Sequence, residues 1–241
     1  MEKKSLIMLV AIMLAVSLNA CSNVWVRGSG DLTTEVRSVR DFTKIDLVGS
    51  GDVIITQTGE ESLAVETDDN IMNHISTEVR GDTLYLSLES TVGSISPTRL
   101  RFWLSVDELE SIENSGSGDI AVKALDTDHL DIEINGSGDV TVTALTAETV
   151  DVDISGSGAV ETAGTSTQQD ISINGSGKYV ASNLQSEIVE VDINGSAAVT
   201  VWATESLDAQ IYGSGDVVYY GAPSVSSSGS GSGKVVHRGH K

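Results

Sequence analysis

The triplet Gly-Ser-Gly recurs about every twenty residues, and this repeat limits the possible folds of the chain more than any other feature. From Gly116 onward the steps between triplets are 20, 20, 19, 20, 18 and 18 residues, counting the degenerate copy Gly195-Ser196-Ala197. Self-similarity at such a period is typical of a solenoid, in which each repeat packs on its neighbours. The complete triplets begin at Gly28, Gly49, Gly116, Gly136, Gly156, Gly175, Gly213 and Gly231.

The residues that flank the triplets alternate between apolar and polar. An aliphatic residue stands two positions before the first glycine, and the residue ahead of it is polar, as in Glu133-Ile134 and Asp153-Ile154. A period of two indicates a strand with one buried face. Each repeat therefore consists of a strand, a Gly-Ser-Gly corner, a second strand and a looser corner. The aliphatic positions are Ile134, Ile154, Ile173, Ile193 and Ile211 before the triplets, and Ile120, Val140, Val160, Val199, Val217 and Val235 after them.

Two arrangements can use such repeats: a stack of parallel coils, or antiparallel hairpins with tight glycine turns. Near-identical side chains recurring once per repeat favour parallel stacking, because each inward residue then lies on its counterpart about 4.8 Å away. The sharp corners are expected to need glycine, often with φ > 0. These structural corner glycines are Gly116, Gly118, Gly136, Gly138, Gly156, Gly158, Gly175, Gly177, Gly213 and Gly215.

Two stretches depart from the regular pattern. Between Asp52 and Ser115 the period is lost, and strands are expected at 53–56, 63–66, 84–88 and 100–104, with a short helix within 70–76. Longer coils of this kind are expected to cover the first regular coil and to block edge pairing. Residues 225–233 have the composition of a Ser/Gly linker, but their triplet keeps the spacing. A final, loosely packed coil is therefore predicted there.

The N-terminus resembles the signal peptide of a bacterial lipoprotein. Lys3 and Lys4 precede an apolar run, and Leu18-Asn19-Ala20-Cys21 matches a lipobox in which the only cysteine becomes the lipidated N-terminus. An ordinary signal peptide with a chance cysteine, or an uncleaved anchor, are the alternatives, although the run is short of the ~20 residues that span a bilayer. The expected location is the cell envelope, at the outer membrane, on its periplasmic side or at the cell surface.

Four segments follow from these patterns. They are the signal peptide (1–20), a tether with a first strand (21–41), irregular N-terminal coils that cap the solenoid (42–115) and regular coils of about twenty residues (116–241).

The mature chain is strongly acidic. Removing Glu2, Lys3 and Lys4 with the signal peptide changes the formal net charge from -21 to -22. Such a surface argues against nucleic acid as a partner. With Cys21 lipidated, no thiol remains for disulfides, metal binding or catalysis, and no cofactor is expected.

Several motifs together resemble the auto-transporter adhesin, head GIN domain family, whose members are secreted and lipoprotein-like proteins of Bacteroidetes and relatives. The residues are Phe42-Thr43-Lys44-Ile45-Asp46, Gly49-Ser50-Gly51-Asp52-Val53, Asp69-Asn70-Ile71 and Gly81-Asp82-Thr83-Leu84, followed by the Gly-Ser-Gly repeats. The resemblance covers about 42–218 and implies a right-handed parallel β-helix. The predicted fold class is thus all-β: a single-stranded right-handed parallel β-helix, or β-solenoid, with irregular longer N-terminal coils. The family has no catalytic residues to carry over.

Three functions remain open. The first is a non-catalytic binding module that uses the faces of the solenoid to hold a glycan or an envelope protein, with its lipid in the membrane. The second is a structural protein that associates with itself, and the third is a polysaccharide-active enzyme, which needs converging carboxylates. The outward acidic residues recur in every strand, as expected of a solvated face; they are Asp131, Glu133, Asp151, Asp153, Glu190 and Asp192. Calcium at the Gly-Ser-Gly-Asp corners is a weaker alternative, because several triplets lack the aspartate.

Overall fold

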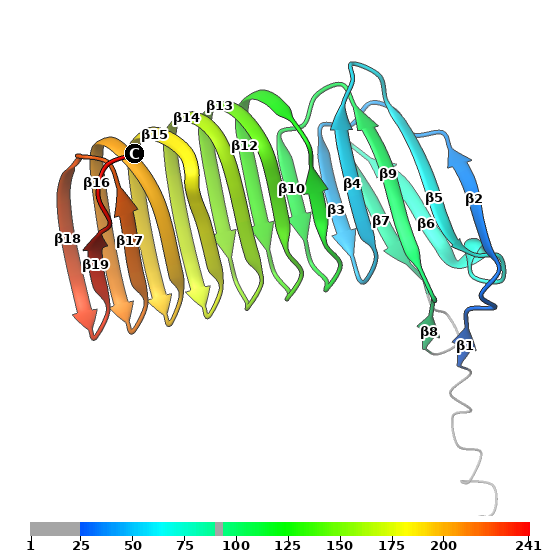
Figure 1. The fold of residues 1–241 in the computed structure, drawn as a ribbon. Helices are drawn as coiled ribbons and strands as arrows, with labels where there is room; N and C mark the ends of the chain where they lie inside the picture. The colour runs from blue at the N-terminus through cyan, green and yellow to red at the C-terminus, as the bar shows by residue number, and fades with distance from the viewer. Residues whose placement is uncertain (1–24, 90–93) are drawn as a thin grey trace, which may run out of the picture.

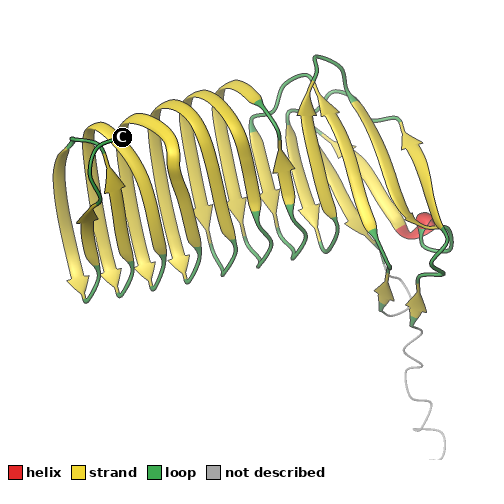
Figure 2. Ribbon diagram, viewed as in Figure 1, coloured by secondary structure: helices red, strands yellow, loops and turns green. Residues whose placement is uncertain are grey.

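The chain folds into a β-solenoid made almost wholly of strands (Figures 1 and 2). The computed structural model describes residues 25–89 and 94–241; the predicted signal peptide and Cys21 lie outside them. The N-terminal part contains β1 (Val26–Arg27), β2 (Leu32–Arg37), β3 (Lys44–Val48), β4 (Asp52–Gln57), β5 (Ser62–Asp68), the 3-10 turn η1 (Met72–His74), β6 (Ile75–Arg80), β7 (Thr83–Leu88), β8 (Ile95–Ser96) and β9 (Leu100–Val106). The repeats contain β10 (Ser111–Asn114), β11 (Ile120–Val122), β12 (Leu125–Ile134), β13 (Val140–Ile154), β14 (Ala159–Gly175), β15 (Lys178–Gly195), β16 (Ala198–Gly213), β17 (Asp216–Tyr220), β18 (Ser224–Gly231) and β19 (Lys234–His237).

Successive turns of the solenoid, here called rungs, stack in parallel and in register. Ile132 pairs with Ile112 on one side and with Val152 on the other, so equivalent positions of the repeat form columns. The predicted parallel stacking is confirmed, and the hairpin alternative is wrong for the repeats. Most rungs from β13 onward are single long strands, because the looser second corner continues as extended backbone between the two flat stretches.

Each rung contributes to two flat layers that face each other. Layer A contains β7, β3, β10, the C-terminal halves of β12 to β16, and β18. Layer B contains β9, β4, β11, the N-terminal halves of β13 to β16, and β17 with β19. The Gly-Ser-Gly corners join layer A to layer B along one edge of the molecule (Figure 1).

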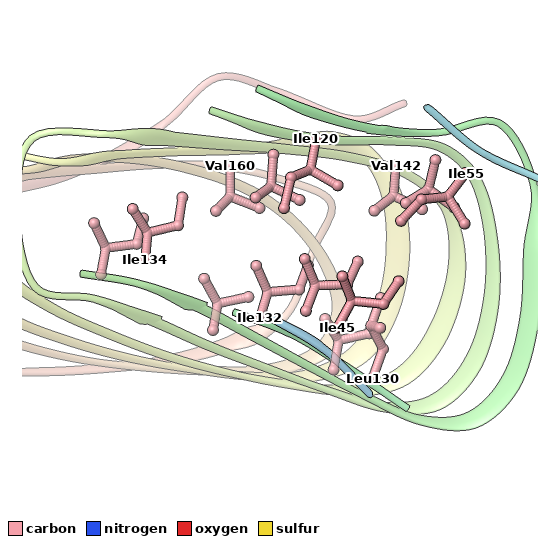
Figure 3. Close-up of a cluster of buried hydrophobic side chains, with 14 of the residues drawn as sticks. Ile45, Ile55, Ile120, Leu130, Ile132, Ile134, Val142 and Val160 are labelled. Atoms are coloured by element: carbon pink, nitrogen blue, oxygen red, sulfur yellow. The ribbon is translucent and has the colours of Figure 1, made fainter. Parts of the chain in front are cut away.

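Aliphatic side chains from both layers fill the space between them. Ile132 and Ile134 point inward from layer A toward Ile120 and Val142 of layer B (Figure 3), and all four are at most 1% exposed. Burying an aliphatic side chain of this size contributes about 1.5–3 kcal/mol. Leu145 and its counterparts at the second corner also turn inward. The alternation read from the sequence thus places a continuous core along the whole stack.

Glycine is required at the first position of a triplet mainly because the neighbouring rung approaches so closely. A Cβ added to Gly136 would lie 1.9 Å from the carbonyl oxygen of Gly116. That same oxygen accepts the N–H of Ser137 at 3.0 Å, so it cannot move away without losing a hydrogen bond between rungs. At Gly136 φ lies outside the left-handed region, whereas at Gly175 φ is +143°. The expectation of positive φ therefore holds only for some corners, and stacking distance explains the others.

The N-terminal part caps the stack by a different topology. After β3 and β4 the chain moves outward and returns, so that β7 and β9 stack parallel on them from the side opposite to β10 and β11. Further out, β5 pairs antiparallel with β9, β2 with β5, and β6 with β7. The predicted irregular strands are present, and the expected helix is the single turn η1. The edge strand β6 was not among the predicted strands.

A buried carboxylate holds the first Gly-Ser-Gly triplet to this cap. Asp68 has no exposed surface, and it accepts hydrogen bonds from the N–H of Gly30 at 2.8 Å and from the N–H and hydroxyl of Thr98 at 2.8 and 2.6 Å. Burial acts to raise the pKa of Asp68, but these hydrogen bonds outweigh it and lower the pKa below its usual value. The triplet at Gly28 is thus a clamp on the cap rather than a corner of the stack.

Replacing Asp68 with asparagine is expected to lower the free energy of unfolding by about 1–3 kcal/mol, because a buried amide cannot accept all of these bonds. Since the folded pKa is lowered, the contribution of Asp68 is present above the unfolded value near pH 4 and is lost as the pH falls through the folded value. Urea denaturation at pH 7 and pH 3 measures both effects. The difference between wild type and Asp68→Asn should shrink at pH 3; a constant difference would contradict the role of the charge.

Candidate binding surfaces

The outer surface of layer A carries stacked columns of carboxylates, here called the acidic face. Two outward positions per rung, separated by one residue, form two columns because the register places each position above its counterpart; each column is acidic in most rungs. The first column contains Asp131, Asp151, Asp170, Glu190 and Asp208; the second contains Asp46, Glu113, Glu133, Asp153 and Asp192. Like charges in register repel each other, so this face costs stability unless something compensates it.

Basic groups stand mainly at the edges of the acidic face. Lys44 forms an ion pair with Asp82, at 2.9 Å, beyond the N-terminal end of the first column. His129 lies 3.9 Å from Asp151 and binds the hydroxyl of Thr149. The pKa values of Asp131 and Asp170 are raised, first by burial and then by neighbouring carboxylates such as Glu133 and Glu190. The electrostatic field of the acidic face therefore favours a positively charged ligand.

Asp46 is the most perturbed carboxylate of this surface. It is 8% exposed, and within the described residues its Oδ1 has no hydrogen-bond partner. Burial, followed by the charges of Glu113 and Glu133, raises the pKa of Asp46 to about 6. The N-terminal end of the second column thus contains a buried carboxylate with one oxygen, Oδ1, that accepts no hydrogen bond from any described residue.

Replacing Asp46 with asparagine is expected to raise the free energy of unfolding at pH 7 by about 1–2 kcal/mol, because the buried charge disappears. The folded pKa lies above the unfolded one, so wild type gains stability as the pH falls through 6 toward 4, whereas the variant does not. Denaturation curves at pH 7 and pH 4 test this. If Asp46→Asn were less stable than wild type at pH 7, Asp46 would have a compensating partner.

The carboxylates of the acidic face are spread out rather than convergent. Within residues 25–89 and 94–241, no group of three or more His, Cys, Asp or Glu side chains is arranged to hold a metal ion. The corner aspartates have another role, because the Oδ1 of Asp119 accepts the N–H of Asp139, and the Oδ1 of Asp139 accepts that of Ala159. These side chains therefore join consecutive rungs at the corner.

The outer surface of layer B is more apolar. Val36, Ala64, Trp103 and Ile54 form a row across β2, β5, β9 and β4. Val36 is 77% exposed and Trp103 37%. A shallow cleft of about 240 Å³ lies over these residues. Near the last rungs of the stack, Trp202 and Tyr220 pair across β16 and β17 under the ammonium group of Lys241.

The described structure also contains a polar network inside the core that sequence reasoning missed. The hydroxyl of Tyr179 contacts Thr162 at 3.1 Å and donates to Gln169 at 2.7 Å, and the amide of Gln169 donates to Ser186 at 2.6 Å. Ser186 in turn contacts Ser166. The tyrosine position was recognisable as inward, but a partner ten residues away on the opposite layer was not.

The predicted site residues fall into two groups. Cys21 lies outside the described residues. The corner glycines all lie along one edge, where a Cβ at the first glycine of each triplet would approach the rung before it, at distances from 1.7 Å for Gly116 to 2.6 Å for Gly175. No helix in the described part of the chain combines the length and the apolarity needed to cross a membrane.

One protein family matches most of the chain. The model of the family described as "Putative auto-transporter adhesin, head GIN domain" matches residues 41–223. No curated protein matches the chain.

Solved structures share the whole fold. A crystal structure of a "putative adhesin" from Bacteroides fragilis NCTC 9343 is 32% identical, with a TM-score of 0.83 over 88% of this chain and 99% of that one. A "putative lipid binding protein" from Parabacteroides distasonis ATCC 8503 is 27% identical, with a TM-score of 0.74 over 89% and 99%. A "putative adhesin" from the same strain, at 23% identity and a TM-score of 0.72 over 89% and 100%, shares the fold. The chain therefore belongs to the auto-transporter adhesin, head GIN domain family.

Proposed function

We propose that this protein is a non-catalytic binding module of the cell envelope, anchored by a lipid on Cys21, that holds a positively charged segment of another envelope protein against its acidic face. The observation that carries the proposal is the register of the columns, which lines up carboxylates on a flat surface along several rungs. Family membership and the adhesin-named relatives support a role in adhesion.

The arrangement supports an extended ligand better than a small one. Neighbouring rungs are about 4.8 Å apart and the two columns about 7 Å apart, so the charges form a grid rather than a cluster. A cationic chain lying over the grid meets several carboxylates at once, and each contact adds to the others. Catalysis on a polysaccharide needs two carboxylates that flank one glycosidic bond from opposite sides, whereas the carboxylates of the grid all point outward from one flat face.

Binding of a fluorescent lysine-rich peptide to the full chain tests the face directly. A variant that removes three charges from the face, Glu133→Gln with Asp151→Asn and Asp153→Asn, is expected to weaken binding at least tenfold and to reduce its dependence on salt. A matched control removes three exposed charges from the second corner, by Asp128→Asn, Glu187→Gln and Glu205→Gln. Equal losses in the two variants would mean that net charge alone attracts the peptide, and the proposed surface would be wrong.

Lipidation is tested separately. Cells that express the full chain are labelled with a fatty-acid analogue, and the label is expected on wild type but not on Cys21→Ala, which should leave the membrane fraction. Labelling that persists in the variant would contradict the anchor. Protease treatment of intact cells then shows whether the solenoid reaches the cell surface.

A further inference from the structure

The last rung of the solenoid ends in two strands that are paired on one side. β18 pairs with β16, and β19 pairs with β17; among the described residues, no strand covers their other edges. Residues 238–241 turn back along layer B, where Gly239 accepts the N–H of Gly221 and Lys241 reaches Asn183. No described residue therefore covers the outer edge of β18, which lies at the end of the stack opposite to the cap (Figure 1).

β18 lacks the usual protection of a free edge. Soluble proteins discourage edge pairing with charged residues, proline or bulges. Ser224–Gly231 contains only serine, glycine and Val225, and all of its residues are exposed. In β19, Lys234 stands beside Asp216 of the rung before, and the next two residues are valines.

The acidic columns stop at this rung. The position of Asp208 is taken by Ser226, and the position of Gln210 by Ser228. A rung stacked beyond β18 would therefore meet hydroxyls, whereas at any earlier rung it would meet the carboxylates of the acidic face. Repulsion between like-charged chains is thus lowest where the stack is open.

The core is also open at this end. Ser227 and Gly229 stand where the previous rung has Ala209 and Ile211. A cleft of about 270 Å³ opens here, and Ile211 and Val235 reach into its lining. A second surface laid over the rung would cover this cleft.

The other end of the stack is closed and charged. In β2, Glu35 and Arg37 form an ion pair at 2.9 Å, and the Arg37 guanidinium also donates to the carbonyl oxygens of Met72 and Ile75 across the gap between the layers. In β6, Glu78 and Arg80 form a second ion pair. Both edge strands at the cap therefore carry charges that oppose pairing.

From this difference between the two ends we propose that the protein dimerises through its last rung, with β18 and β19 of one copy placed edge to edge against the last rung of a second copy. Because the cap is protected, the contact joins two open ends related by a two-fold axis and closes at two copies. Head-to-tail stacking would use the cap of every copy and would grow without limit.

The contact is small. An eight-residue strand is about 26 Å long and the layers are about 10 Å apart, so each copy contributes on the order of a few hundred Å². Interfaces of this size are weak and transient. The dimer is therefore expected to form in the range of tens to hundreds of micromolar and not at low micromolar concentration.

Sedimentation equilibrium of the full chain in density-matched detergent measures the association. The mass is expected to rise from one to two chains as the concentration increases from about 5 µM to about 1 mM, a range that brackets a weak interface. The variant Ser226→Asp with Ser228→Asp extends the acidic columns by one rung and should remain a monomer throughout. Its circular dichroism should match wild type, because the preceding rung already holds Asp208 at the first of these positions.

A matched variant places the same charges at the cap, by Thr34→Asp in β2 and Ser76→Asp in β6, and should dimerise as wild type does. Hydrogen exchange gives a local readout: amides of β18 should exchange at least threefold more slowly at high concentration, and those of β2 should not change. A wild-type monomer at 1 mM, growth beyond two chains, or loss of association in the cap variant would each overturn the proposal.

Discussion

Replacing Gly136 with alanine is expected to destabilise the solenoid by about 3 kcal/mol or more, which places it among the severe single substitutions. The added Cβ would lie 1.9 Å from the carbonyl oxygen of Gly116. That oxygen accepts the N–H of Ser137, so relief of the clash breaks the contact between two rungs at their corner. Each rung is stabilised mainly by its neighbours, and the damage therefore falls on both interfaces of the rung. Thermal denaturation followed by circular dichroism measures the loss, expected at roughly 6–12 °C for a chain of this size.

The second glycine of a triplet provides the control. A Cβ at Gly177 would meet a side-chain methyl group of Ile154 at 2.5 Å and the carbonyl oxygen of Gly158 at 3.1 Å. A methyl group can shift, whereas a bonded carbonyl cannot. The chain already carries Ala197 at the equivalent position of its degenerate triplet, buried at 1% exposure. Gly177→Ala is therefore expected to cost less than about half as much as Gly136→Ala. Equal costs would mean that glycine is needed for chain flexibility and not for the approach of the rungs.

Most of the repeat could be predicted from its sequence because one physical constraint acts many times. Parallel stacking places the same position of each repeat in one column. When isoleucine or valine recurs at that position, each repeat is separate evidence that the column is buried. Ile132, Val152 and Ile171 each support the same conclusion. The last rung was predicted for the same reason: its triplet keeps the spacing although its composition is that of a linker.

The cap could not be predicted to the same depth, since no repetition supports it. The return of β7 and β9 to stack on β3 and β4 depends on contacts between segments 39 and 49 residues apart. Asp68 illustrates the problem: its neighbours Gly30 and Thr98 come from distant loops, and nothing local indicates that its charge is buried. Likewise, the alternating pattern of the sequence places the side chain of Asp46 on the outer surface of its strand. The pattern does not indicate that this side chain is more than nine-tenths buried, which is what raises its pKa.

The second large effect is the loss of stability expected when the polar network inside the core is broken. Tyr179→Phe is expected to lower the free energy of unfolding by about 2–3 kcal/mol, because the side-chain carbonyl of Gln169 then loses its donor in a fully buried site. Gln169→Leu should cost a similar amount, since it leaves the hydroxyl of Tyr179 with Thr162 alone and removes a donor to Ser186. Urea denaturation of both variants at pH 7 provides the two values. Burial also raises the pKa of Tyr179, which favours the protonated hydroxyl that donates to Gln169.

The double variant decides whether the network acts as a unit. When both partners of a buried hydrogen bond become apolar, neither is left unsatisfied, and the cost should fall below the sum of the single costs by about 1–2 kcal/mol. Strict additivity would mean that water or a rearranged side chain satisfies each partner in the single variants.

The network joins the two layers, because Tyr179 begins the layer B part of its rung and Gln169 begins the layer A part of the preceding one. Aliphatic columns alone tolerate a slip of one layer against the other; a hydrogen bond between two defined positions does not. Loss of the network should therefore broaden the unfolding transition as well as lower it.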